Sequence, residues 1–228
     1  MKRLVRVLRT GLLPYTKSLV LQKTLSQHVL NGTFSNILVI TEHPPVYTIG
    51  IRTKQYTIQD EERLKRLGAE FHKTNRGGLI TFHGPGQLVA YPIVNLKNFQ
   101  PSMKWFVCHV EKTVIDLCKK YGIEARTTAD TGVWVEDRKI CAIGVHGSRY
   151  VTTHGLALNC CTDLNWFEHI VPCGIPGKGV TSLSEELKEK ITIDAALPKF
   201  LQSFSDIFGA DIDDFNAEET KNLLNSIS

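Results

Sequence analysis

Short apolar segments joined by tight turns constrain the fold of this chain more than any other feature. Residues 132–135 and 139–145 flank a turn at Asp137-Arg138, and a third apolar segment follows at 152–159. Strands separated by so few residues pair as antiparallel hairpins, whereas consecutive parallel strands need a crossover of roughly a dozen or more residues. We therefore predict an α/β (α+β) fold with a mixed sheet and flanking helices, and not a doubly wound parallel sheet.

The other hydrophobic periodicities predict further strands and helices. Strands are expected at residues 5–8, 36–40, 46–49, 70–73, 79–82 and 87–94. Helices are expected from Pro14 to about Leu30, Gln59 to Leu67, Ser102 to Tyr121 and Asp194 to Phe208, with a short helix that begins at a capping box of Ser182 and Glu185. The length of 228 residues predicts one domain, residues 1–228, with a polar C-terminal tail from about residue 209.

Charge is unevenly distributed along the chain. Residues 1–41 carry six Lys/Arg and no Asp or Glu, whereas residues 185–228 carry ten acids and four bases. This asymmetry suits a protein that docks an acidic partner at one end, although two solvated faces would give the same pattern. No basic run is interleaved with aromatic residues, and no apolar run approaches the roughly 18 residues of a membrane span. We therefore expect neither nucleic-acid binding nor a membrane segment.

The acid-free, Arg-bearing start has the composition of a mitochondrial targeting segment. However, residues 4–8 already alternate like a first strand, which argues against a long cleavable presequence. We therefore expect a targeting signal that is internal to the fold, or none.

The six cysteines have neither the spacing of a metal site nor that of a disulfide framework. No CxxC occurs, and Cys160 and Cys161 are adjacent at the end of an expected strand, so their side chains point to opposite faces. The histidines form no HxxH or HExxH pattern. We therefore predict no metal, a reducing compartment, and a core thiol at Cys118, which shares the apolar spacing of its helix.

Cys173 is the candidate nucleophile. It lies in the segment Pro-Cys-Gly-Ile-Pro-Gly at residues 172–177, whose prolines and glycines predict a rigid turn. Lys139 follows a tight turn and begins an apolar run. An inward-pointing amine is desolvated toward its neutral, proton-accepting form, and a nearby ammonium favours a thiolate, so such a pair can act as base and nucleophile. Most hairpin lysines are instead solvated, and the sequence does not place the two side chains together.

Residues 76–87, with the sequence Arg-Gly-Gly-Leu-Ile-Thr-Phe-His-Gly-Pro-Gly-Gln, form the densest unusual stretch. Their glycines allow backbone to approach a ligand closely, because glycine lacks a Cβ. Two tight turns around a plain strand, with His83 as an ordinary polar residue, would also explain them. The run from His154 to Asn159 is small and apolar, which suits either a slot for an alkyl chain or a core strand.

Together these segments resemble the lipoyl(octanoyl) transferase family, also called the LipB family, over nearly the whole chain. The most specific match is residues 76–87. The other matching segments are Leu13 through Gln22, Glu42 to Gly50, Lys139, His154 to Asn159, Val171 to Ile175, and Val180 to Leu183. The resemblance is weakest after about residue 205.

The resemblance implies an acyltransferase that takes octanoyl from octanoyl-acyl carrier protein and places it on a specific lysine of a lipoyl domain. It implies a thioester intermediate on Cys173, Lys139 as the acid/base, and no cofactor. The acceptors would be the lipoyl domains of 2-oxoacid dehydrogenase E2 subunits and the glycine cleavage H protein. The implied fold is that of lipoate and biotin ligases, which are related to class II aminoacyl-tRNA synthetases. Eukaryotic members are mitochondrial, so we expect a mitochondrial protein, with a bacterial-type cytoplasmic enzyme as the alternative.

The resemblance also implies which residues line the acyl pocket. They come from three segments, at residues 76–83, 142–144 and 155–157. The implied substrate-binding residues are Arg76, Gly77, Gly78, Leu79, Ile80, Thr81, Phe82, His83, Ala142, Ile143, Gly144, Gly155, Leu156 and Ala157.

Two other functions stay open from the sequence. An ATP-dependent lipoate or biotin ligase of the same fold would activate a free acid as an adenylate and would need no nucleophilic cysteine. A protein of a different class would bind acyl carriers or lipoyl domains without catalysis. The presence of Cys173 and Lys139 at the positions that match the transferases favours the transferase.

Overall fold

The main sheet draws strands from both ends of the chain. In this computed structural model the described residues are 3–53, 56–170 and 178–227. The strands of the main sheet are β1 (Arg3–Leu12), β2 (Asn36–Glu42), β6 (Gln87–Val94), β7 (Val133–Val135), β8 (Arg138–Ser148), β9 (Val151–Asn159), β10 (Gly179–Val180) and β11 (Ala210–Asp214). Their order is β10-β8-β9-β6-β2-β1-β11, with β7 paired to β8 off this path. A smaller sheet has the order β4-β3-β5, made of β4 (Glu70–Lys73), β3 (Val46–Ile49) and β5 (Thr81–His83).

The main sheet is mixed, as the sequence predicts. β1 runs parallel to β2 and β11, and β10 runs parallel to β8. The neighbours β2 and β6, β6 and β9, β8 and β9, and β7 and β8 are antiparallel. The turn-joined segments of the sequence are thus the β7–β8–β9 meander, and the predicted α/β (α+β) class is confirmed.

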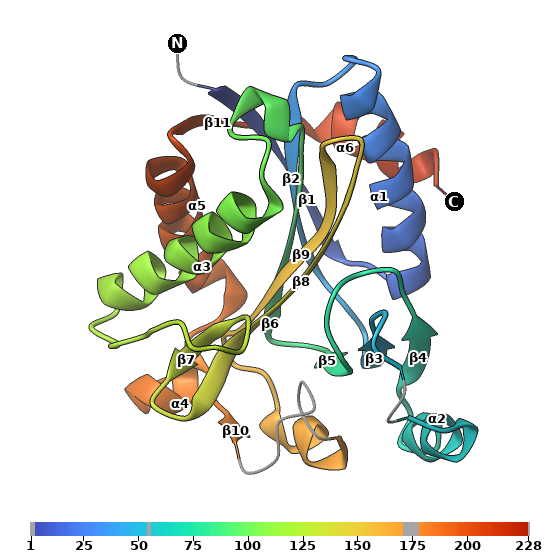
Figure 1. The fold of residues 1–228 in the computed structure, drawn as a ribbon, viewed down its shortest axis with the longest axis vertical. Coiled ribbons are helices and arrows are strands. Elements are labelled where there is room, and N and C mark those ends of the chain that lie inside the picture. Colours follow the sequence, from blue (N-terminus) through green and yellow to red (C-terminus); the bar gives the residue numbers. More distant parts are fainter. Residues whose placement is uncertain (1–2, 54–55, 171–177, 228) are drawn as a thin grey trace.

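Helices cover both faces of the main sheet (Figure 1). The α-helices are α1 (Tyr15–Leu30), α2 (Ile58–Lys65), α3 (Met103–Lys120), α4 (Leu183–Leu187), α5 (Ile193–Phe208) and α6 (Ala217–Asn225), and the 3-10 helices are η1 (Leu96–Asn98) and η2 (Leu164–His169). α3 and α5 pack on one face around Phe106, Phe200 and Phe204, whereas α1 packs on the other through Leu21 and Leu25. None of the helices in the described ranges is long and apolar enough to cross a bilayer.

Local sequence signals set the ends of two of these helices. Ser102 caps α3 by accepting a hydrogen bond from a backbone N–H of the first turn, and the apolar face of α3 buries Cys118, as predicted. Ser182 caps α4 in the same way, by accepting from the backbone N–H of Glu185 at 3.1 Å. The Glu185 carboxylate accepts from Lys188 Nζ at 2.6 Å instead of completing the expected capping box.

One predicted strand is displaced. Residues 79–82 were expected to be extended, but β5 begins only at Thr81, because the preceding residues belong to a loop that crosses the β8–β9 hairpin. Within that loop the N–H of Gly77 donates to Val145 O at 2.9 Å. The glycine pair therefore ties the loop to the hairpin instead of starting a strand.

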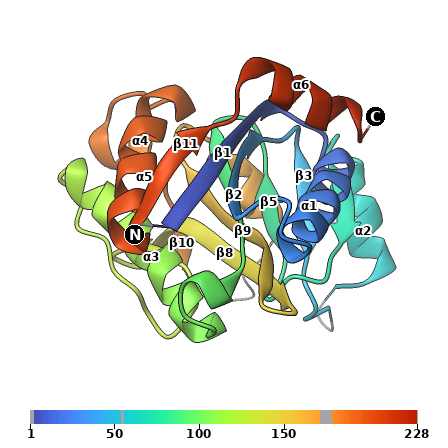
Figure 2. The same cartoon turned by 90° about the horizontal axis from the view of Figure 1, so that it is seen from above.

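The polar C-terminal segment that the sequence predicts from about residue 209 forms strand β11 and helix α6. β11 extends the main sheet along the outer edge of β1, as Figure 2 shows, with Arg3 opposite Ala210 and Val7 opposite Asp214. Pairing with β1 overrides the low strand propensity of a segment rich in Asp. α6 follows β11 and packs against β1.

At this edge of the sheet, basic residues near the start of the chain pair with acidic residues near its end. Arg6 donates to both carboxylate oxygens of Glu219 at 3.0 and 2.7 Å, and Arg9 donates to those of Asp214 at 3.1 and 3.0 Å. The guanidinium of Arg6 also stacks on Phe215, 3.8 Å from the ring centroid. These pairs favour the interpretation that the basic start and acidic end serve the fold over the one in which they dock a partner.

Candidate active site

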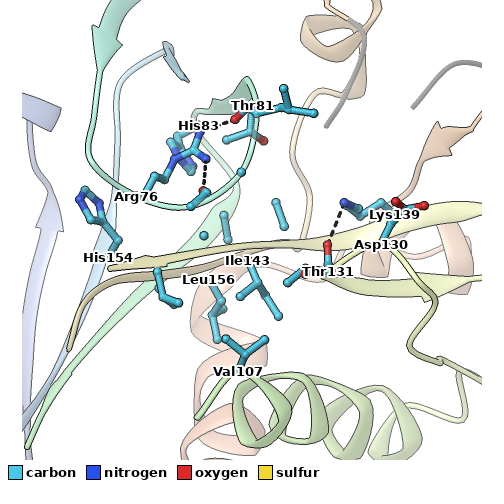
Figure 3. Close-up of a pocket in the computed structure, with 18 of the residues that line it drawn as sticks. Arg76, Thr81, His83, Val107, Asp130, Thr131, Lys139, Ile143, His154 and Leu156 are labelled. Carbon is cyan, nitrogen blue, oxygen red and sulfur yellow. Dashed lines mark hydrogen bonds between the residues drawn. The ribbon is translucent and has the colours of Figure 1, made fainter. Parts of the chain in front are cut away.

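A cavity of about 280 Å³ lies between the β8–β9 hairpin, helix α3 and the loop that precedes β5 (Figure 3). Lys139, with Asp130 and Thr131, lies at one end of the view, and Arg76 and His83 lie at the other. The lining therefore joins segments that are far apart in the sequence, as expected for a binding site at the edge of a sheet.

Arg76 holds the loop that forms one wall of the cavity, which we call the roof (residues 76–79). Its guanidinium donates to the carbonyls of Gly77 and Leu79, both at 2.9 Å, and to that of Thr48 at 2.7 Å. Arg76 is only 7% exposed. This arginine thus fixes the roof from within the protein, by bonding the backbone of its own loop and of β3.

Small residues of β8 and β9 face the roof. Ala142 is paired with Ala157, and Gly144 with Gly155. A Cβ added to Gly144 would lie 2.9 Å from Gly77 O and 3.0 Å from the Arg76 side chain. The close approach of roof and hairpin therefore requires glycine at this position.

The next cross-strand pair points to the opposite face of the hairpin. Ile143 is paired with Leu156, and both side chains extend toward Val107 of α3 (Figure 3). All three line the cavity. The cavity therefore follows the edge of β8 and has apolar walls on its α3 side.

The structure brings together most of the residues that the family resemblance implied for the acyl pocket. Lining the cavity are Arg76, Gly77, Gly78, Leu79, Thr81, His83, Ala142, Ile143, Gly144, Gly155, Leu156 and Ala157. Ile80 and Phe82 do not line it. They are fully buried in a separate apolar cluster with Tyr47 and Phe167, because alternate residues of an extended segment point to opposite sides.

Lys139 points inward. It is 5% exposed, its Nζ donates to Thr131 O at 3.1 Å, and the same atom lies 4.6 Å from the centroid of the Trp134 ring. Gly132, with φ +128°, packs against it, since a Cβ there would lie 3.2 Å from Lys139 Cε. The lysine is therefore a buried group at the cavity and not a solvated hairpin residue.

Cys173, the candidate nucleophile, lies outside the described residues. The chain that follows it is anchored beside the lysine, because β10 pairs Val180 with Lys139 and Thr181 N donates to Lys139 O at 3.0 Å. The described residue after the 171–177 segment, Lys178, lies 5.0 Å from the Trp134 ring that also contacts Lys139.

The end of the cavity near the roof is polar but largely uncharged. Burial lowers the pKa of His83 to about 3 and that of His154 to about 4, and the Arg76 cation adds to both shifts. Burial also raises the pKa of Tyr15 to about 12. Near neutral pH these side chains are therefore neutral hydrogen-bonding groups around a single buried guanidinium.

Sequence reasoning missed several lining residues. These are Tyr15, Arg52, Tyr91, Val107, Ala129, Asp130, Thr131 and Val145. Val107 carried a signal, since it shares the apolar spacing of α3, but that spacing predicts a core position equally well. For the residues from α1 and β6, no local pattern indicates that their side chains meet at this cavity.

Residues 14–205 match the model of the lipoyl protein ligase A/B catalytic domain. The chain belongs to this family. It is 55% identical to a mitochondrial octanoyl-[acyl-carrier-protein]:protein N-octanoyltransferase of Danio rerio, over 91% of this chain and 93% of the relative. It is 45% identical to the Homo sapiens protein of the same name, over 90% of this chain and 93% of the relative. These relatives confirm the resemblance predicted from the sequence motifs.

Solved structures of the lipoyl protein ligase A/B family share this fold. A lipoate-protein ligase A crystallised with ATP covers 100% of this chain and 94% of its own, with a TM-score of 0.71 and 15% sequence identity. At this identity the likeness establishes the architecture alone. It confirms the predicted fold of lipoate ligases.

Proposed function

We propose that this protein transfers an octanoyl group from octanoyl-acyl carrier protein to a specific lysine of lipoyl domains, the first committed step of protein lipoylation. Relatives that are 45 and 55% identical and named mitochondrial octanoyltransferases support both the activity and a mitochondrial location. The proposed acceptors are the lipoyl domains of 2-oxoacid dehydrogenase E2 subunits and the glycine cleavage H protein. The observation that carries the proposal is the buried Lys139 at one end of an apolar-walled cavity on this catalytic domain.

The cavity suits a medium-length alkyl chain. Val107, Ile143 and Leu156 supply apolar walls on one side of the β8 edge, and the paired Ala142 and Ala157 add small apolar side chains to the lining. Each methylene taken out of water contributes about 0.8 kcal/mol. Binding in the apolar part therefore favours an octanoyl donor over an acetyl donor.

In the proposed first half-reaction, the Cys173 thiolate attacks the thioester carbonyl of the donor. A C–S bond to the enzyme forms, the C–S bond to the carrier breaks, and the carrier leaves as a thiolate that takes up a proton. One thioester replaces another of similar energy, so the step needs no ATP. The anchoring of Val180 and Thr181 on the strand of Lys139 supports a nucleophile close to that lysine.

In the proposed second half-reaction, the amine of the acceptor lysine attacks the acyl-enzyme. A C–N bond forms, the C–S bond to Cys173 breaks, and the thiolate is released. The attacking nitrogen must lose a proton, which a neutral Lys139 amine can accept. The contacts that hold Lys139 Nζ at the cavity, with Thr131 O and the Trp134 ring, support this role.

Intact-mass spectrometry tests the proposal. After incubation with octanoyl-acyl carrier protein and no ATP, the wild-type protein should gain the mass of one octanoyl group and pass it to a lipoyl domain. Cys173→Ser should abolish transfer while the circular dichroism spectrum stays native. Cys161→Ser, which removes a partly exposed thiol outside the cavity lining, is the matched control and should retain both steps.

Three results would contradict the proposal. Persistent transfer by Cys173→Ser would remove the cysteine from the reaction. Activity only with free octanoate and ATP would identify an ATP-dependent ligase. Binding of the carrier without any change in mass, and without product, would identify a binding protein.

A further inference from the structure

Buried polar side chains connect the roof of the cavity to the backbone of Lys139, away from the apolar part of the pocket. All are between 0 and 7% exposed, and each lies in a different strand or loop. In spatial order they are Arg76, Thr48, His83, Gln87, Asn159 and Thr181. Buried polar groups are costly unless they are paired, so a series of this length constrains the geometry of every member.

The carbonyl at one end fixes the direction of the hydrogen bonds. Thr181 O accepts from Asn159 Nδ2 at 2.9 Å, so Asn159 Oδ1 faces Gln87 and accepts from its Nε2 at 2.9 Å. The same Nε2 also donates to Phe82 O at 3.2 Å. The remaining amide atom of Gln87, Oε1, then lies 2.8 Å from Nδ1 of His83.

This arrangement determines the tautomer of His83. Because Gln87 Oε1 is only an acceptor, Nδ1 of His83 carries the proton. His83 Nε2 then accepts from Thr48 Oγ1 at 3.3 Å, and that hydroxyl oxygen accepts from Arg76 Nη2 at 3.0 Å. Every member therefore donates in the same direction, from the Arg76 cation toward Thr181.

The series of hydrogen bonds ends at the strand that carries Lys139. The peptide N–H of Thr181 donates to Lys139 O at 3.0 Å, and β10 pairs Val180 with Lys139. Hydrogen bonds aligned head to tail polarise one another and strengthen the series. The Asn159–Thr181 bond thus holds β10, the first described strand after Cys173, against the backbone of Lys139.

We propose that Gln87 and Asn159 are positioning residues for acyl transfer. Neither residue lines the cavity, so neither touches the acyl chain. They act through Thr181, which they hold in register beside Lys139. This inference rests on the proposed function, since it takes Cys173 and Lys139 as the reacting groups.

Asn159→Asp tests the positioning role. An ionised carboxylate does not donate to Thr181 O, so kcat should fall about 10- to 100-fold, as for a small displacement of reacting groups, with little change in KM for the octanoyl donor. A protonated Asp both donates and accepts, so the rate relative to wild type at the same pH should recover as the pH is lowered. Asn159→Ala removes both functions and should show no recovery.

A purely structural role predicts a different result. Both variants would then lose stability, and their rates per correctly folded enzyme would equal the wild-type rate at every pH. If the wild-type protein does not become octanoylated, the proposed function fails. If it does, and Asn159→Asp matches the wild type throughout, only the positioning role fails.

Nitrogen-15 NMR of the imidazole rings tests the direction of the hydrogen-bond series without an activity assay. The His83 resonances, assigned by their loss in His83→Gln, should show a protonated Nδ1 and an unprotonated Nε2 near neutral pH. Gln87→Leu removes the acceptor of the Nδ1 proton and should shift the population toward the other tautomer. A wild-type signal from the Nε2–H tautomer would overturn the assigned direction.

Discussion

The two edges of the main sheet are held together in opposite ways. At the β11 edge, β1 is joined to the C-terminal segment by exposed charges, and the side chains of Arg9 and Asp214 are 51 and 52% exposed. Toward the β10 edge, the buried, uncharged amides of Gln87 and Asn159 connect β6 and β9 to Thr181, which follows β10. Exposed ion pairs adapt to small displacements and contribute little stability, whereas buried amides tolerate only one arrangement. The difference indicates that the positions of the strands are most tightly fixed beside Lys139.

Loss of Lys139 should have the largest effect of the changes considered, and that effect is on catalysis. Replacement of the buried amine in Lys139→Ala should reduce the rate of octanoyl transfer by about 100- to 10,000-fold, as for loss of a general acid or base. Lys178→Ala is the matched control, because the Nζ atoms of both lysines lie over the ring of Trp134, at 4.6 and 5.0 Å, but Lys178 is the more exposed. Single-turnover kinetics with octanoyl-acyl carrier protein measure both. Equal rates for the two variants would remove the special role of Lys139.

A smaller effect concerns stability in mild acid. Burial lowers the pKa of His83 from 6.5 to about 3 and that of His154 from 6.5 to about 4. The unfolded chain therefore binds more protons than the folded chain below about pH 6.5, so the free energy of unfolding should decrease as the pH falls from about 6.5 to about 4. Urea unfolding over this range measures the slope.

The ion pairs at the β11 edge should lose their contribution to the free energy of unfolding only at lower pH. The hydrogen bond from Arg6 lowers the pKa of Glu219 from 4.5, so the contribution of that pair is complete above pH 4.5 and is lost as the pH falls further. His154→Gln should flatten the slope above pH 4.5, whereas Glu219→Gln should leave it unchanged. An unchanged slope in His154→Gln would show that the histidine does not contribute to it.

The smallest expected effect comes from the exposed pairs themselves. Arg9→Ala removes two hydrogen bonds to Asp214, yet the free energy of unfolding should change by no more than about 0.5 to 1 kcal/mol, since both partners are half exposed. The difference from wild type should shrink further in high salt, which screens exposed charges. Chemical denaturation at low and high ionic strength provides the measurement. A larger, salt-independent loss would show that this edge is as tightly specified as the other.

Strong periodicity and a specific motif made much of the molecule predictable. The expected helix from Ser102 to Tyr121 is α3, which spans Met103–Lys120, and the turn-joined segments are strands. The motif at residues 76–87 located the roof but not the orientation of each side chain. Ile80 and Phe82 face the core because the extended segment alternates, and its register depends on pairing with β3.

Residues that act together across long separations were not predictable. Gln87 and Asn159 are 72 positions apart, and neither has a local pattern that indicates a partner. Val107 looked like a core residue because helical spacing identifies an apolar face without revealing whether protein or a cavity lies opposite. The β11 strand escaped prediction for the same reason, since its conformation depends on β1 and not on its own composition.

The pairing of β1 with β11 has a consequence for biosynthesis. The second residue of each pair is made about two hundred positions after the first, since Arg3 meets Ala210. Until the ribosome has released β11, the backbone hydrogen-bonding groups along one side of β1 have no partner strand. An unpaired strand edge can pair with other chains and cause aggregation. Nonsense mutations that end translation before Ala210 would therefore endanger solubility, although they spare every residue that lines the cavity.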